Sequence, residues 1–148
     1  MSIGTFKATV KKKEGLAVEV ESRGFKVNVD QPESVGGSNT GMNPVELLLG
    51  SLGACQTITA ISLASHYKID LKDLWVELEG DLDLDSLSGS KPQVEKGFKN
   101  IRFNFHVKSD SPEKKVKELV SHVEKICPVL QTLLKNVRVD KAKVTMEN

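Results

Sequence analysis

Cysteine is scarce in this chain: Cys55 and Cys127 are the only two among 148 residues. Their spacing fits neither a CxxC redox motif nor a zinc-ligand pattern, and three scattered histidines do not supply one. An excess of charge is lacking as well, because 21 basic residues stand against 20 acidic ones. Such a balance gives no field that would attract nucleic acid or a membrane surface. We therefore expect no nucleic-acid or membrane partner, no metal site and no cofactor.

Long uninterrupted apolar runs are also missing. The start, MSIGTFKATVKKKEG, has no apolar core of a signal peptide. The longest apolar region, Leu47 to Ala64, is interrupted by Gln56, Thr57, Thr59 and Ser62, which predicts that it is too polar to span a membrane. We expect a cytoplasmic protein. Reducing conditions there favour free thiols or catalytic redox chemistry over a structural disulfide.

The pattern along the chain predicts one domain over residues 1–148 with an α+β fold. Alternating and β-branched segments indicate strands, and a turn signal at Glu14-Gly15 joins the first two. The predicted order is βββ-α-ββ-α-β, with helices packed against antiparallel sheets. The predicted strands cover residues 3–12, 16–22, 25–30, 74–82, 98–108 and 137–146, and the predicted helices begin at Asn43 and Ser111.

The first predicted helix carries a clear start signal. Asn43 can cap it, Pro44 suits its first position, and Glu46 stands three residues after the cap. Its apolar residues lie nearly all round, which predicts burial on most sides. Gly53 and its small neighbours would let another backbone or a substrate come close to this helix.

The second cysteine stands where the chain must bend. Pro128 disfavours helical geometry at Cys127, near the end of the second predicted helix. If the two helices pack together, an attacking and a resolving thiol share one pocket. An attacking cysteine must be a thiolate, and the neighbours Ser51 and Thr59 bring no positive charge to Cys55. The cation must then come from elsewhere, such as another subunit.

Other interpretations remain open at this stage. A buried cysteine taken alone is more often an inert small hydrophobe than a nucleophile. The chain could be a thiol-disulfide redox protein that ignores peroxides, or a binding module for apolar ligands. It could also be a structural dimer with merely packed cysteines.

Three sequence elements resemble the osmotically inducible protein C / organic hydroperoxide resistance (OsmC/Ohr) family, in a less characterised branch. They are Gly36-Gly37, NPVELLLGSLGAC from Asn43 to Cys55, and ICPV from Ile126 to Val129. The order of strands and helices agrees over essentially the whole chain. The resemblance implies an intertwined homodimer in which two antiparallel sheets wrap a pair of central helices.

The resemblance also implies a thiol peroxidase that protects against oxidative stress. Cys55 would reduce an organic hydroperoxide and become a sulfenic acid, and Cys127 would condense with it to a Cys55–Cys127 disulfide. A dithiol such as dihydrolipoamide would then reduce the disulfide. Well-studied branches carry a carboxylate directly after the NP pair, where this chain has Val45 and then Glu46. Glu46 is therefore both a capping residue and a candidate supporting carboxylate, and Arg23 is the candidate supporting cation.

Overall fold

A computed structural model describes residues 1–87 and 89–147. The chain forms two compact units, Met1–Gly50 and Ser51–Asn148. Helix α1 (Pro44–Ala64) begins in the first unit and continues into the second. The fold is α+β with antiparallel sheets, as the sequence predicts. That the whole chain acts as one domain stays a prediction.

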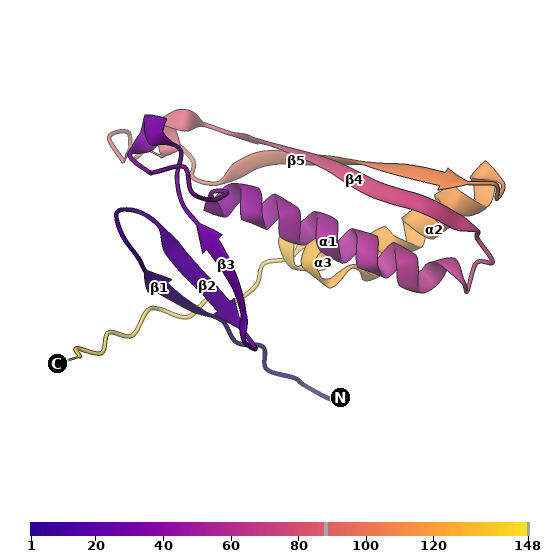
Figure 1. Cartoon of the computed structure of the whole chain (residues 1–148), viewed down its shortest axis with the longest axis horizontal. Helices are drawn as coiled ribbons and strands as arrows, with labels where there is room; N and C mark the ends of the chain where they lie inside the picture. Colours follow the sequence, from indigo (N-terminus) through magenta and orange to yellow (C-terminus); the bar gives the residue numbers. More distant parts are fainter. Residues whose placement is uncertain (88, 148) are drawn as a thin grey trace. The chain divides into compact units, whose positions relative to one another are not determined.

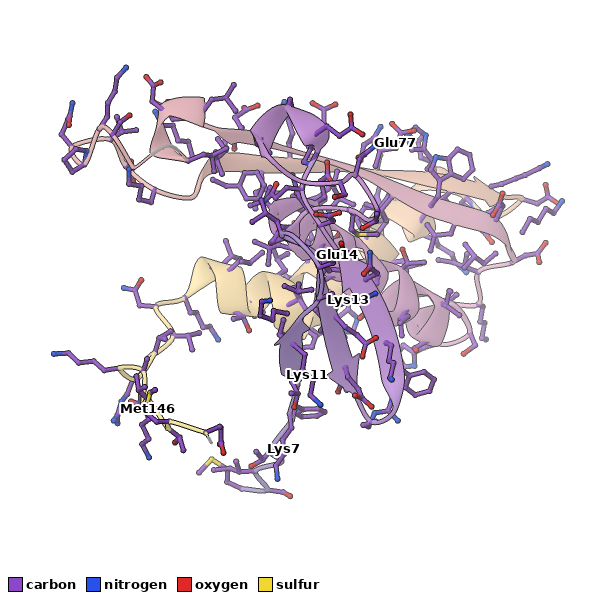
Figure 2. The ribbon with its side chains drawn as sticks, turned by 60° about the vertical axis from the view of Figure 1, so that its left-hand side comes forward. Lys7, Lys11, Lys13, Glu14, Glu77 and Met146 are labelled. Carbon is purple, nitrogen blue, oxygen red and sulfur yellow. The ribbon has the colours of Figure 1, made fainter. Side chains whose placement is uncertain are left out.

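The first unit contains a three-stranded antiparallel sheet in the order β1-β2-β3 (Figure 1). The turn between the first two strands has Gly15 at a positive φ of 62°, which glycine adopts without strain. Lys13 and Glu14 lie close together at this hairpin, and Lys11 lies further along it (Figure 2). The three predicted strands are confirmed, although the first starts later than residue 3. Their bounds are β1 Thr9–Lys12, β2 Val18–Ser22 and β3 Phe25–Val29.

A buried carboxylate organises the loop that follows β3. Asp30 is 1% exposed and accepts hydrogen bonds from the backbone N–H groups of Gln31, Ser38 and Thr40. The Thr40 hydroxyl donates to the same carboxylate at 2.7 Å. These donors, the hydroxyl first, lower the pKa of Asp30, because they favour its charged form. The loop also contains a short 3₁₀ helix, η1 (Glu33–Val35).

Gly37 lies where two backbone segments of this loop come into close contact. A Cβ placed on Gly37 would lie 1.9 Å from the carbonyl oxygen of Gln31. Backbone cannot move aside as a flexible side chain can, so only glycine fits. Close backbone packing therefore explains the glycine at the second position of the Gly36-Gly37 element.

Gly37→Ala should therefore destabilise the protein by about 1–3 kcal/mol, the usual cost of overpacking. Chemical denaturation measures it, with Gly4→Ala as the matched control. A Cβ at Gly4 would meet Phe6 at an ordinary 3.8 Å, so the control should stay within about 0.5 kcal/mol of wild type. Equal stability of the two variants would contradict this account of the loop.

The second unit is built on a long two-stranded antiparallel sheet. Strands β4 (Leu71–Leu82) and β5 (Phe98–Ser109) pair with Leu78 opposite Phe103 and Val76 opposite Phe105. A short 3₁₀ helix, η2 (Leu84–Ser86), follows β4. The paired strands run along α1, with α2 and α3 close to the same helix (Figure 1).

Two apolar clusters hold the helices of this unit to its sheet. One cluster joins Ala60 of α1 to Leu119 and Val123 of α2, with Phe105 of β5 packed against it. The other contains Leu52, Cys127 and Leu130. The helix bounds are α2 Glu113–Ile126 and α3 Pro128–Leu134.

Helix α1 starts as predicted. The backbone N–H of Asn43 donates to Glu46 Oε2 at 2.8 Å, and the N–H of Glu46 donates to Asn43 Oδ1 at 2.9 Å. This reciprocal pair is a capping box, which satisfies N–H groups that the first helical turn leaves without partners.

Helix α1 is less buried than predicted. One stripe faces the interior, whereas Ile58 and Ile61 are 64% and 57% exposed on the single chain. Length and composition alone also make α1 apolar enough to cross a membrane, so the prediction that its polar residues exclude this was wrong. The same composition suits a core helix. The inward stripe consists of Leu52, Gly53, Gln56, Ala60 and Ala64.

The predicted last strand, Val137 to Met146, was wrong. Within the part of the chain that the structure describes, the segment after α3 has no regular secondary structure. It contains Met146 (Figure 2). A strand forms only when its backbone N–H and C=O groups pair with a neighbouring strand, and alternation alone does not supply that neighbour. The exposed residues Val137, Val139, Val144 and Met146 give the alternation.

Candidate active site around two thiols

The structure brings Cys55 and Cys127 together. Cys55, in the middle of α1, packs against the cluster of Leu52, Cys127 and Leu130. Both cysteines are free thiols. Gly53 lets α1 lie close to β4, because a Cβ there would come within 2.6 Å of Leu78 Cδ1. The sequence predicts a shared pocket for the thiols only if the two helical regions pack together, and they do.

The two thiols differ in accessibility. Cys127 has no exposed surface, whereas Cys55 is partly exposed. Burial raises the pKa of the Cys127 thiol, the N–H group of Leu130 opposes this, and the neighbouring Cys55 thiol raises it further. Cys127 is therefore held as a neutral thiol. Of the two sulfurs, only Cys55 can be reached from outside without rearrangement.

The bend at Cys127 is confirmed. Its backbone is extended (φ −64°, ψ 112°), so it ends α2 and begins α3, with Pro128 at the first position of α3. Its N–H still donates to the Val123 carbonyl at 2.9 Å, and its carbonyl accepts from Gln131 N–H at 2.9 Å. Cys127 therefore stands at the junction of two helices, with its backbone hydrogen-bonded to both.

An apolar hollow of about 440 Å³ adjoins the thiol cluster. It shares Leu52 and Leu130 with the cluster, and Ile101 and Phe103 of β5 line both. Predominantly apolar walls with a few polar groups are typical of small-molecule sites. The polar lining residues are Lys99, Asn100 and Glu124.

Leu48, Leu52 and Ile58 are apolar residues of α1 on either side of Cys55, and one of them packs with the thiols. Leu52 is 1% exposed and belongs to the thiol cluster. Leu48 and Ile58 are 38% and 64% exposed on the single chain. Sequence periodicity could not separate them from Leu52, because the apolar residues of α1 lie nearly all round the helix.

The two candidate supporting residues have local structural roles in the first unit. Glu46 completes the capping box described above. Arg23, with a positive φ of 52°, lies in the turn between β2 and β3, and its Cζ is 5.2 Å from the centre of the Phe25 ring. Lys13, directly after β1, donates to Asn28 Oδ1 at 3.0 Å. Catalytic roles for Glu46 and Arg23 stay predictions.

Gln56 was missed by sequence reasoning as a site residue. It was noted only as a polar interruption of the apolar stretch, yet its side chain is fully buried beside Cys55 in sequence. Gln56 lies four residues after Leu52 and four before Ala60, and both of these are on the inward stripe. A polar residue at this spacing is the signal that could have identified it.

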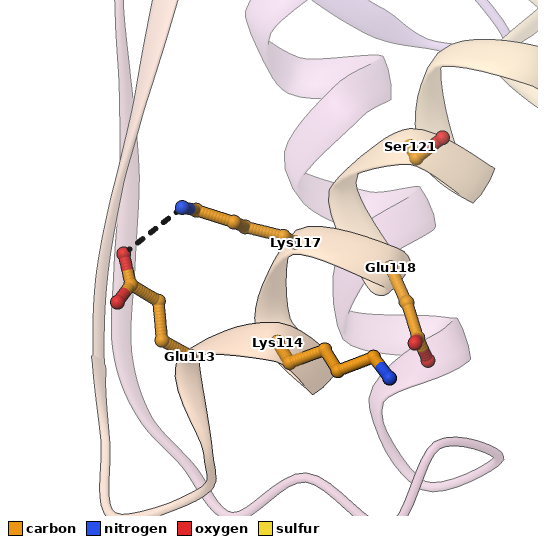
Figure 3. Close-up of a pocket in the computed structure, with 5 residues that line it drawn as sticks. All are labelled: Glu113, Lys114, Lys117, Glu118 and Ser121. Carbon is orange, nitrogen blue, oxygen red and sulfur yellow. Dashed lines mark ion pairs between the residues drawn. The ribbon is translucent and has the colours of Figure 1, made fainter.

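A separate hollow on the outer face of α2 is unrelated to the thiols. Its lining is charged and exposed, and Glu113 pairs with Lys117 at 3.2 Å one turn apart (Figure 3). This is the solvated face of an amphipathic helix. Among residues 1–87 and 89–147, no group of three or more His, Cys, Asp or Glu side chains is placed to hold a metal.

Comparison with known proteins places these features in a family. Residues 37–141 match the profile of the OsmC-like protein family. A relative from Mycoplasma genitalium, named hydroperoxide reductase, is 25% identical over 118 residues, which cover 79% of this chain and 78% of the relative.

Solved structures agree with the fold. An OsmC-like protein from Mycoplasma pneumoniae is similar with a TM-score of 0.76 at 24% identity, covering 88% of each chain. An organic hydroperoxide resistance protein from Legionella pneumophila has a TM-score of 0.67 at 24% identity, covering 90% of this chain and 91% of its own. The name of the Mycoplasma genitalium relative supports a hydroperoxide-related redox role.

Proposed function

Because the chain belongs to the OsmC-like protein family, we propose that it is a cysteine-based peroxidase that reduces organic hydroperoxides. The observation that carries the proposal is the thiol pair: an accessible Cys55 packed against a buried, neutral Cys127. We place it in the cytoplasm, as an antioxidant enzyme acting as a homodimer. The reductant is a dithiol, such as dihydrolipoamide.

The reaction has two steps on the protein. The Cys55 thiolate attacks the outer oxygen of the hydroperoxide, the O–O bond breaks, and the organic oxygen leaves as an alcohol after taking a proton. Cys55 is now a sulfenic acid. The Cys127 sulfur then attacks Cys55 Sγ, the S–O bond breaks, and water leaves as the disulfide forms. A dithiol reduces the disulfide to restore both thiols.

The raised pKa of Cys127 supports this assignment of roles. A neutral thiol is a poor nucleophile toward peroxide, so Cys127 does not compete with Cys55 in the first step. It does not need to ionise until the sulfenic acid lies beside it. Cys55, the partly exposed thiol, is also the one that a substrate can reach.

The apolar hollow predicts the substrate preference. One buried CH₂ group contributes about 0.8 kcal/mol, so a few extra carbons change affinity about tenfold or more. We expect kcat/KM for cumene hydroperoxide to exceed that for hydrogen peroxide by about tenfold or more. Steady-state assays with a dithiol reductant and a panel of hydroperoxides measure this. Comparable values for the two substrates would contradict a role for the hollow in binding.

The same panel separates the alternatives. A dithiol protein that exchanges with disulfides but ignores every peroxide is a thiol-disulfide redox protein. Thiols that react with neither are packed structural groups. The proposal requires loss of both thiols that depends on the organic hydroperoxide.

A further inference from the structure

The Gln56 side chain is enclosed without a hydrogen-bond partner. Its relative exposure is 0%, and neither Nε2 nor Oε1 has a partner among the residues that the structure describes. Leaving a buried polar group unpaired costs about 1–3 kcal/mol. Nearly all buried polar groups in proteins are paired, so an exception such as this one calls for a reason.

Its position relates Gln56 to the thiols. On the inward stripe of α1, Leu52 packs with Cys127, and Ala60 packs with Val123, one helical turn before Cys127. Gln56 lies between Leu52 and Ala60 on that stripe, and it directly follows Cys55. The amide is therefore at the level of the thiol pair along α1.

The enclosure limits what could pair with the Gln56 amide. The side chain is covered completely by the residues of its own chain, so a second copy cannot reach it. Any partner is therefore small. The reaction proposed above creates such a group, because it places one oxygen atom on Cys55.

We propose that Gln56 is a positioning residue of the thiol reaction, whose amide binds the sulfenic oxygen formed on Cys55. This inference rests on the proposed function. Nε2 donates a hydrogen bond to that oxygen while Cys127 Sγ attacks Cys55 Sγ. As the S–S bond forms and the S–O bond breaks, the oxygen gains negative charge, takes the Cys127 proton and leaves as water.

The enclosure strengthens this effect. A hydrogen bond in a dry, apolar setting is electrostatically stronger than one in water, and strongest toward an atom that is gaining charge. No residue that the structure describes pairs with the amide, so its hydrogen bond is available to the intermediate and the leaving oxygen. Gln56 would favour the second step while leaving the first almost unaffected.

The variant Gln56→Met tests the proposal, because Met matches Gln in length and lacks the amide. We expect disulfide formation after a single turnover with cumene hydroperoxide to slow by about five- to tenfold, the loss expected for one hydrogen bond. Sulfenic acid formation should change less than about twofold. Dimedone should accordingly trap more sulfenic acid than in wild type. Stopped-flow kinetics and quenched intact-mass spectra resolve the two steps.

Stability separates this role from a structural one. Removing an unpaired amide should leave the Tm unchanged or raise it by a few degrees, so the kinetic defect cannot come from misfolding. Leu119→Met is the matched control: it places the same side chain at another fully buried site, in the cluster that joins α1 to α2. The control should show wild-type rates for both steps. Gln56→Leu is the second apolar variant if Gln56→Met folds poorly.

Each result decides the proposal. If wild type reacts with the hydroperoxide but both Gln56 variants form the disulfide at the wild-type rate, the inference about Gln56 is wrong and the proposed function stands. If wild type shows no hydroperoxide-dependent change in mass, the proposed function fails, and the role of Gln56 fails with it. Slowing of the first step alone would also overturn the inference.

Discussion

Cys55→Ser is expected to abolish hydroperoxide turnover, lowering kcat/KM by at least about a thousandfold, because a serine hydroxyl is scarcely ionised at neutral pH. Cys127→Ser should react once and stop at a sulfenic acid on Cys55. The reason is the difference in burial: the hydroperoxide reaches Cys55, and Cys127 is enclosed with its pKa raised. Single-turnover assays with dimedone and intact mass measure both outcomes.

The same pair of variants tests the assignment of roles. Dimedone labelling should be confined to Cys55 in the Cys127→Ser protein. Equal labelling of Cys127 in the Cys55→Ser protein would reverse the roles. A conservative replacement elsewhere in the cluster, such as Val129→Ile, should still give the wild-type sequence of sulfenic acid and then disulfide.

The second large effect is dissociation of the proposed homodimer by a charge placed on the uncovered face of α1. Ile58 and Ile61 leave an apolar face on α1 that the single chain does not cover. Burying one such side chain stabilises by about 1.5–3 kcal/mol, and placing a charge there removes this and adds a desolvation cost. Ile61→Asp should therefore prevent assembly, with loss of folded protein at micromolar concentration.

Analytical ultracentrifugation at sub-micromolar concentration measures the assembly, together with unfolding at several protein concentrations. Wild type should sediment as a dimer and unfold at a temperature that rises with concentration. Leu84→Asp, at a position 77% exposed in η2, is the control and should behave as wild type. A compact, active wild-type monomer would refute the homodimer.

The features predicted correctly from sequence are those fixed by neighbouring residues. The capping box of Asn43 and Glu46 and the break at Cys127 depend on side chains within three residues of each other, and both are confirmed. The features that failed depend on distant partners. The segment after α3 alternates like a strand but lacks a pairing strand among the described residues.

In the candidate site, too, the features that depend on distant contacts could not be predicted from the sequence. The sequence could state only a condition for the two thiols, because Cys55 and Cys127 meet through packing of α1 against α3. Leu52 and Ile58 look equivalent in a helix whose apolar residues lie nearly all round, yet one is buried and the other exposed. The enclosure of Gln56 follows from neighbours on other elements, so its unpaired amide could not be seen in the chain alone.

The central claim is that Cys55 and Cys127 form one peroxide-reducing pair. The most direct test is to treat fully reduced wild-type protein with one equivalent of cumene hydroperoxide and to follow free thiols and intact mass. The account predicts that both thiols disappear together, that the mass falls by the two hydrogens lost to an intramolecular disulfide, and that dihydrolipoamide restores both. Thiols that persist unchanged, or a stable sulfenic acid with Cys127 still free, would contradict it.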